Sequence, residues 1–169
     1  SISFSLRNEN SQWNPDNISG TGQYLSEQQE IRVRYAMKHS PTPEWIDGGV
    51  FWLSEWDVPN NGIEARFKAT SVLGFMNETY DGIKSGSLYD IAEAALKQAP
   101  LPALSNGHKN YELDPILENY STSFDGVYTI AEVLQLIAHA AGCVMYQDRQ
   151  GTLHIEDWNP NYSNYVIDE

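Results

Sequence analysis

The sequence predicts an α+β fold in which an antiparallel β-barrel-like part precedes a helix-helix-hairpin part. Two observations predict it. Apolar residues alternate at every second position in three short segments before about residue 76, and they recur at helical spacing in two segments after about residue 77. We therefore expect two domains, at residues 1–76 and 77–169. With 169 residues, 41% of them hydrophobic, the chain is large enough to bury a core.

The first domain is predicted to hold four strands. Three of them show period-two alternation, which places one face inward, and a fourth is more continuously apolar. An Asn-Gly pair at Asn61-Gly62 is typical of a tight hairpin turn before the last strand. Stretches rich in Asn, Pro, Gly and Ser predict loops at 8–22 and 39–49. The four strands are expected at residues 2–6, 31–35, 50–56 and 63–67.

The second domain is predicted to contain two amphipathic helices and a β-hairpin. Ser87 is a suitable N-cap for the first helix, and Thr129 with Glu132 forms a capping-box pattern for the second. Gly142 suits the position after the last helical turn. The expected ranges are 88–99 and about 130–141 for the helices, and 143–146 and 152–156 for the hairpin strands.

Charge and cysteine content exclude several classes of function. The formal net charge is -13, from 23 acidic and ten basic residues, so we expect no nucleic-acid partner. No apolar run approaches the roughly 18 residues of a membrane-spanning helix, so we expect no membrane insertion. The single cysteine, Cys143, excludes an internal disulfide and a Cys-based zinc cluster. The chain opens in a strand pattern without Met, and we expect it to be a piece of a longer protein.

Four acidic residues near two neighbouring strands form the strongest candidate for chemistry. Glycoside hydrolysis uses a pair of carboxylates, and a cell-wall hydrolase would need such a pair here. Some of these acids, however, alternate with apolar residues as solvent-facing strand residues do. We therefore expect catalysis to be absent. The four are Asp47, Glu55, Asp57 and Glu64.

Cys143 with His139 and Asp148 has the composition of a nucleophile with a base, but a cysteine at a helix end entering a strand is usually a small buried hydrophobe. The four histidines lack metal-ligand spacing. We expect no enzyme activity, no metal and no cofactor. The histidines are His39, His108, His139 and His154.

Three tryptophans between residues 45 and 56 are the candidate contact residues: Trp45, Trp52 and Trp56. Strand periodicity places Trp52 and Trp56 on one face and Phe51 with Leu53 on the other. Three interpretations remain open. The tryptophans could form a core, an intersubunit contact or a platform for sugar rings.

Several short sequence motifs occur in a recognisable order. An opening strand at residues 2–8 leads into Trp13-Asn14-Pro15-Asp16-Asn17, and then into the strand at 30–34. The second half has a helix start at Ser87-Leu88-Tyr89-Asp90-Ile91-Ala92 and a helix-to-hairpin segment at 130–155, with its turn in 146–153. This order of motifs resembles the tail-tip or baseplate hub proteins of tailed bacteriophages.

This resemblance implies a non-enzymatic structural component of a phage or prophage virion. In the family, such segments form a β-barrel and an α+β domain that build a ring closing the tail tube. The implied partners are further copies of the chain and other tail or baseplate proteins. The implied location is the virion tail, assembled in the bacterial cytoplasm. The alternative is a carbohydrate- or host-receptor-binding module of a tail protein, with a host-surface glycan as its ligand.

Overall fold

The computed structural model describes residues 1–37, 43–59 and 63–158, and these residues divide into two compact units. Unit 1 comprises Ser1–Asn77, Pro100–Asn110 and Gln147–Leu153. Unit 2 comprises Glu78–Ala99, Tyr111–Tyr146 and His154–Glu169. The change of unit after Asn77 lies next to the predicted boundary, and two later segments of the chain join the first unit.

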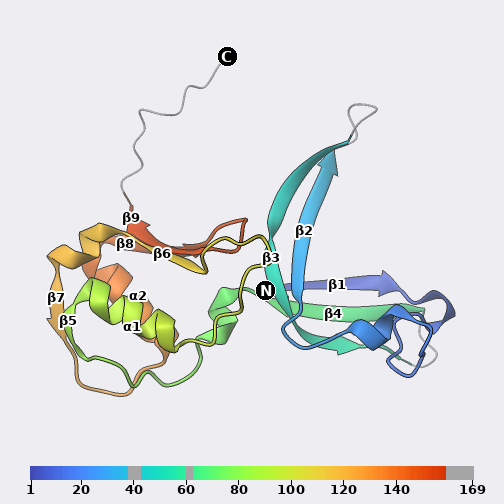
Figure 1. Cartoon of the computed structure of the whole chain (residues 1–169), viewed down its shortest axis with the longest axis horizontal. Helices are drawn as coiled ribbons and strands as arrows, with labels where there is room; N and C mark the ends of the chain where they lie inside the picture. The colour runs from blue at the N-terminus through green and yellow to red at the C-terminus, as the bar shows by residue number, and fades with distance from the viewer. Residues whose placement is uncertain (38–42, 60–62, 159–169) are drawn as a thin grey trace, which may run out of the picture. The chain divides into compact units, whose positions relative to one another are not determined.

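Unit 1 is built on a four-stranded antiparallel sheet that curves into a half-barrel (Figure 1). Together with the helices of unit 2, this sheet confirms the predicted α+β class with a barrel-like β part. The strand order is β1 (Ile2–Arg7), β4 (Glu64–Thr70), β3 (Glu44–Asp57) and β2 (Glu30–Met37).

The half-barrel core follows from the period-two pattern. In β4, Ala65, Phe67 and Ala69 are buried while Arg66 and Lys68 between them are exposed. Leu53 of β3 forms a core cluster with Ala65 and Phe67. Partly buried side chains from other segments pack against this cluster: Phe4, Trp13, Leu25, Ile31, Trp56 and Val58.

The loop after β1 covers the same cluster and is held together by its own hydrogen bonds. The indole of Trp13 meets the ring of Phe67 edge-on, with ring centroids 5.5 Å apart. Asn8 is buried, and its side-chain oxygen accepts from the backbone N–H of Trp13 at 3.0 Å. Gly22 lies so close to the Trp13 carbonyl that a Cβ would come within 2.3 Å of that oxygen. Short 3-10 turns at η1 (Glu9–Ser11) and η2 (Thr21–Tyr24) complete the loop.

The predicted loop at 39–49 is wrong over its second part, because β3 begins at Glu44 and pairs with β2. Gly48 and Gly49 form a β-bulge at the point where the register shifts between Val33 and Arg34. Pairing with a strand far along the sequence therefore overrides the loop-like composition. The predicted turn at Asn61-Gly62 lies outside the described residues.

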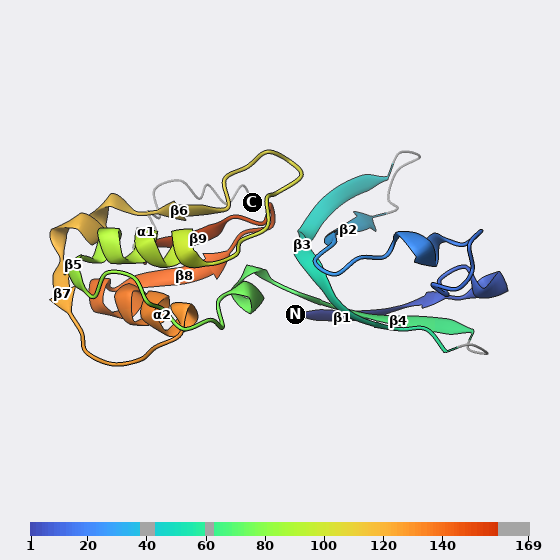
Figure 2. The same ribbon diagram turned by 60° about the horizontal axis from the view of Figure 1, so that its bottom comes forward.

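Unit 2 combines two helices with small sheets (Figure 2). The helices α1 (Leu88–Gln98) and α2 (Ile130–Ala141) pack against each other through their apolar stripes. One sheet has the order β6 (Tyr111–Leu113), β9 (Leu153–Asp157), β8 (Cys143–Gln147), and the other pairs β5 (Ser85–Ser87) with β7 (Ser121–Ser123). Two further 3-10 turns are η3 (Val72–Phe75) in unit 1 and η4 (Pro115–Asn119) in unit 2.

The predicted helix caps are confirmed. Ser87 accepts a hydrogen bond from the Asp90 backbone N–H, and Thr129 and Glu132 form a complete capping box. Gly142 ends α2 in the left-handed conformation, with φ of 70°. These local signals fix where both helices start and where α2 stops.

Candidate functional site

The outer part of the β2–β3 hairpin forms a two-stranded arm, which we define as residues 34–37 and 44–47. Arg34 is opposite Asp47 and Met37 is opposite Glu44, whereas β3 begins to pair with β4 only at Trp52. In the described part of the chain these arm residues therefore pair only with each other. The arm extends beyond β1 and β4 within unit 1 (Figure 1).

Large apolar side chains are exposed on both faces of the arm. Directly opposite residues of two antiparallel strands share a face, so Tyr35 lies beside Ile46, and Ala36 lies beside Trp45 on the other face. The exposed fractions are 62% for Tyr35, 61% for Trp45 and 39% for Ile46. An isolated two-stranded hairpin is at best marginally stable in water, so an arm with this surface is suited to contact a partner.

A polar network fixes the base of the arm. Asp47 receives hydrogen bonds from Arg34 Nε at 2.9 Å and from Gln150 Nε2 at 3.0 Å. Glu30 accepts from Arg32 Nε at 2.6 Å, and Ser105 donates to it through both its backbone N–H and its hydroxyl, at 2.8 and 2.6 Å. The arm thus starts from a defined position in unit 1.

The network also sets the protonation of its two acids. Burial alone would raise the pKa of Glu30, but the hydrogen bonds from Ser105 and Arg32 outweigh this effect and lower the pKa below its ordinary value. The hydrogen bond from Gln150 lowers the pKa of Asp47, and the charge of Arg34 adds to the effect. Both carboxylates are ionised at neutral pH.

The turn between β8 and β9 supports β3 from the side of the arm's base. Gln147 donates to the Val50 carbonyl at 2.7 Å and accepts from the Val72 backbone N–H at 2.8 Å. Gly151, with φ of 100°, lies against Val50 and Leu104, so that a Cβ would come within 2.6 Å of Leu104 Cδ2. The middle of β3 is therefore clamped within unit 1, while its first residues remain exposed.

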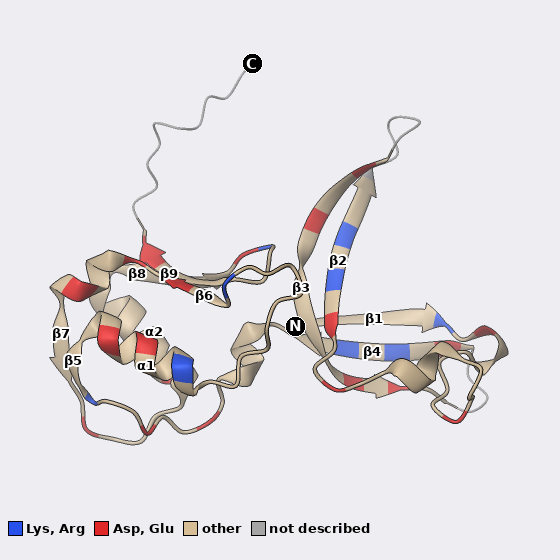
Figure 3. Cartoon of the chain, in the orientation of Figure 1, with Lys and Arg blue, Asp and Glu red and all other residues tan. Residues whose placement is uncertain are grey.

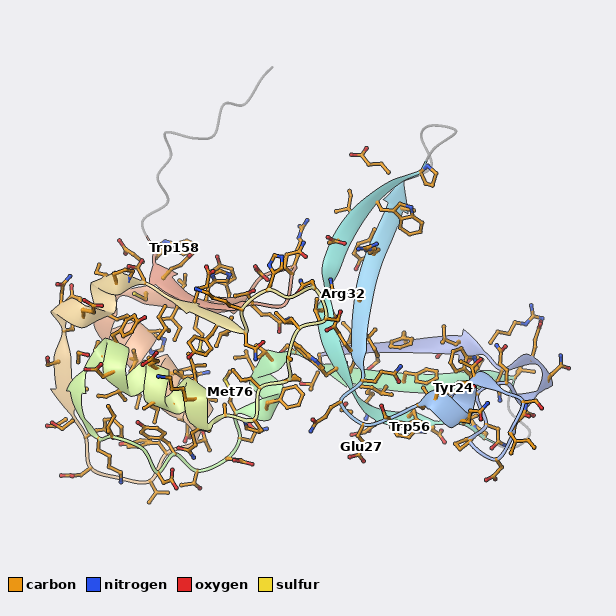
Figure 4. All side chains as sticks on the ribbon, viewed as in Figure 1. Tyr24, Glu27, Arg32, Trp56, Met76 and Trp158 are labelled. Carbon is orange, nitrogen blue, oxygen red and sulfur yellow. The ribbon has the colours of Figure 1, made fainter. Side chains whose placement is uncertain are left out.

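The three predicted contact tryptophans lie in three different environments. Trp52 is 1% exposed and meets Phe75 edge-on, with ring centroids 5.6 Å apart. Trp56, labelled in Figure 4, packs against the half-barrel core. Of the three tryptophans only Trp45 is largely exposed, and it lies on the arm. The structure therefore leaves Trp45 as the accessible member of the set.

The prediction that Trp52 and Trp56 share a face is wrong. A second β-bulge shifts the register between Leu53 and Glu55, so Leu53 is opposite Ala69 and Trp56 is opposite Phe67. Because the extra residue reverses the alternation, Trp56 joins Leu53 on the core face and Trp52 lies on the other.

The candidate catalytic acids are distributed over the sheet with basic neighbours. Glu55 accepts from Lys68 Nζ at 2.8 Å, and Asp57 is opposite Arg66 in the register. Glu64 lies opposite Arg7 at the far end of β4. The fourth acid, Asp47, belongs to the arm-base network.

Cys143 is buried at the start of β8, and burial together with nearby carboxylates raises the pKa of its thiol. Its thiolate is therefore disfavoured at neutral pH. His139 is exposed near the end of α2. Over residues 1–37, 43–59 and 63–158, no group of three or more His, Cys, Asp or Glu could hold a metal ion. The helices of these same ranges include none that is long and apolar enough to cross a membrane.

Neither protein-family models nor curated protein sequences gave a match to this chain.

Tyr35 and Ile46 are contact candidates that sequence reasoning missed. Tyr35 ends the predicted strand at 31–35, and its period-two position gave no sign that the strand would extend beyond the sheet. Ile46 fell inside the predicted loop. The sequence Glu44-Trp45-Ile46-Asp47 did contain a signal for an exposed strand. In an extended segment, each of its two faces would carry one acidic and one apolar side chain.

Proposed function

We propose that this chain is a structural component of a phage or prophage tail tip or baseplate hub, and that it acts through protein-protein contacts. One observation carries the proposal: the arm presents Tyr35, Ile46 and Trp45 to solvent on a firmly anchored base. Aromatic residues on a pre-positioned element are typical anchors of protein interfaces.

The resemblance in the order of short sequence motifs supports the same assignment, and the fold is compatible with it. The motif at residues 13–17 has a structural role here. Trp13 packs against the half-barrel core, and the Asn17 side chain donates hydrogen bonds to backbone carbonyls of the same loop. A scaffold protein needs such rigid local structure to hold its interfaces in place.

Immunogold labelling of particles from the strain that encodes the chain tests this function. Antibody raised against the chain is expected to label one end of the tail, and deletion of the gene is expected to leave tails unassembled or without a tip. Unlabelled intact tails, together with normal particles from the deletion strain, would contradict the proposal. Purified capsids provide the matched negative control.

A further inference from the structure

A second exposed apolar surface lies in unit 2, where α2 meets the start of α1 and the strand β7. We call it the α2 groove. Its volume is about 240 Å³, which is below the roughly 300–1,000 Å³ of typical small-molecule sites. Leu136 on its rim is 50% exposed, although it belongs to an otherwise well-packed helix. Phe124, Val133 and Ala140 line it with Leu88, Thr122 and Ile137.

The charges of the chain are divided unequally between the two units (Figure 3). Unit 1 holds eight of the ten basic and ten of the 23 acidic residues, a net charge of -2. Unit 2 holds two basic and 13 acidic residues, a net charge of -11. The arm with its base, residues 30–47, has three of each sign and is neutral.

This unequal charge distribution disfavours some contacts between two copies by electrostatic repulsion. A contact between two copies of unit 2 would bring two strongly negative surfaces together, and like charges at an interface oppose association. A contact between unit 2 and the neutral stretch 30–47, which contains the arm, avoids that repulsion. It also covers the exposed side chains of the arm and of the groove in a single interface, whereas arm-to-arm contact would leave the groove exposed.

We propose that the arm of one copy docks into the α2 groove of a second copy. This inference rests on the proposed function and identifies the interface that would build an assembly. The two surfaces that meet are different, so a single contact leaves one copy with a free arm and the other with a free groove. A second contact either closes a reciprocal dimer or extends the assembly into a ring or a filament.

Two point variants test the interface by sedimentation velocity of the 169-residue chain over a range of concentrations. Trp45→Asp disables the arm, and Leu136→Asp disables the groove. The wild-type chain is expected to form dimers and larger species. Each variant alone is expected to associate about 10-fold or more weakly, as anchor residues do. An equimolar mixture of the two is expected to form dimers that grow no further, because one intact arm and one intact groove remain.

Matched controls place a similar change elsewhere. Trp158→Asp alters another exposed tryptophan, and Gln135→Asp adds the same charge to an exposed position of α2 that does not line the groove. Both are expected to associate like the wild type, and circular dichroism with thermal melting checks that every variant is folded. A monomeric wild type, a mixture that stays monomeric, or controls that fail like the test variants would each overturn the inference. Immunogold labelling of tails is independent of these outcomes, so failure of the interface and failure of the proposed function remain distinguishable.

Discussion

At the scale of single residues, the same amino acid has opposite roles in one strand. Trp45 and Trp52 lie seven residues apart in β3, yet one is exposed on the arm and the other is 1% exposed beside Phe75. The difference arises from what covers each position. The turn at 147–153, which has Leu104 beside its Gly151, contacts Val50 in the middle of β3, and β4 pairs with β3 from Trp52 onward.

Replacing these two tryptophans is therefore expected to have very different effects on folding. Trp52→Ala removes a fully buried side chain, and we expect it to lower the free energy of unfolding by about 3–5 kcal/mol. Trp45→Ala is expected to change that free energy by less than about 0.5 kcal/mol, as for most exposed positions. Urea unfolding followed by circular dichroism measures both. Equal losses would show that the arm contributes to the core.

Glu30 gives a prediction for acidic conditions. Its folded pKa lies below the ordinary value of 4.5, so its stabilising effect is fully present above about pH 4.5 and is lost as the pH falls through the folded pKa. At pH 7, Glu30→Gln is expected to lower the free energy of unfolding by about 1 kcal/mol, because a charged acceptor is replaced by a neutral one. Wild type and variant should converge toward pH 3.

Thermal melts at several pH values measure this convergence. Glu27→Gln is the control, because it changes an exposed glutamate of the same unit. A Glu30→Gln deficit that stays constant from pH 7 to pH 3 would mean that the ionised carboxylate is not the stabilising group.

At the scale of elements, the β8–β9 turn is a support for β3. Gly151 adopts φ of 100° and faces Val50 and Leu104, so Gly151→Ala strains the backbone and also crowds β3. Gly107 has φ of 75° with nothing within 4 Å of a Cβ, so Gly107→Ala meets the backbone strain alone. We expect Gly107→Ala to lower the free energy of unfolding by about 1–2 kcal/mol, and Gly151→Ala to lower it further. Equal losses in chemical denaturation would show that the turn does not press on β3.

The elements also show how far sequence reasoning reaches. Local signals were sufficient for α1 and α2, because a cap and an apolar stripe lie within each helix itself. They failed where pairing with a distant strand decides the structure. The segment at 44–49 is a strand because β2 lies beside it, and a bulge near Ser54 reverses the faces of the residues that follow. The three-residue strands β5, β6 and β7 are too short for a period to be visible.

The arm as a candidate site was only partly predictable for the same reason. Composition drew attention to Trp45, because tryptophan is rare and Phe51, Trp52 and Trp56 follow it closely in the sequence. Tyr35 and Ile46 also lie on the arm. They are exposed because β3 pairs with β4 only from Trp52 onward, so the first residues of β3 pair with β2 alone. The point at which this pairing starts is a property of the whole sheet, and no local pattern specifies it.

At the scale of the whole molecule, the net charge of -13 controls how copies approach one another. If the arm and the α2 groove form the contact, its attraction is apolar and the long-range force between copies is repulsive. Raising NaCl from about 20 to about 200 mM shortens the screening length from roughly 20 Å to roughly 7 Å. Self-association of the wild-type chain is therefore expected to strengthen several-fold, which sedimentation at both salt concentrations measures. An interface held mainly by ion pairs would weaken with salt, so a weaker association at 200 mM would count against the apolar contact. Leu136→Asp supplies the control, because its association should stay weak at both concentrations.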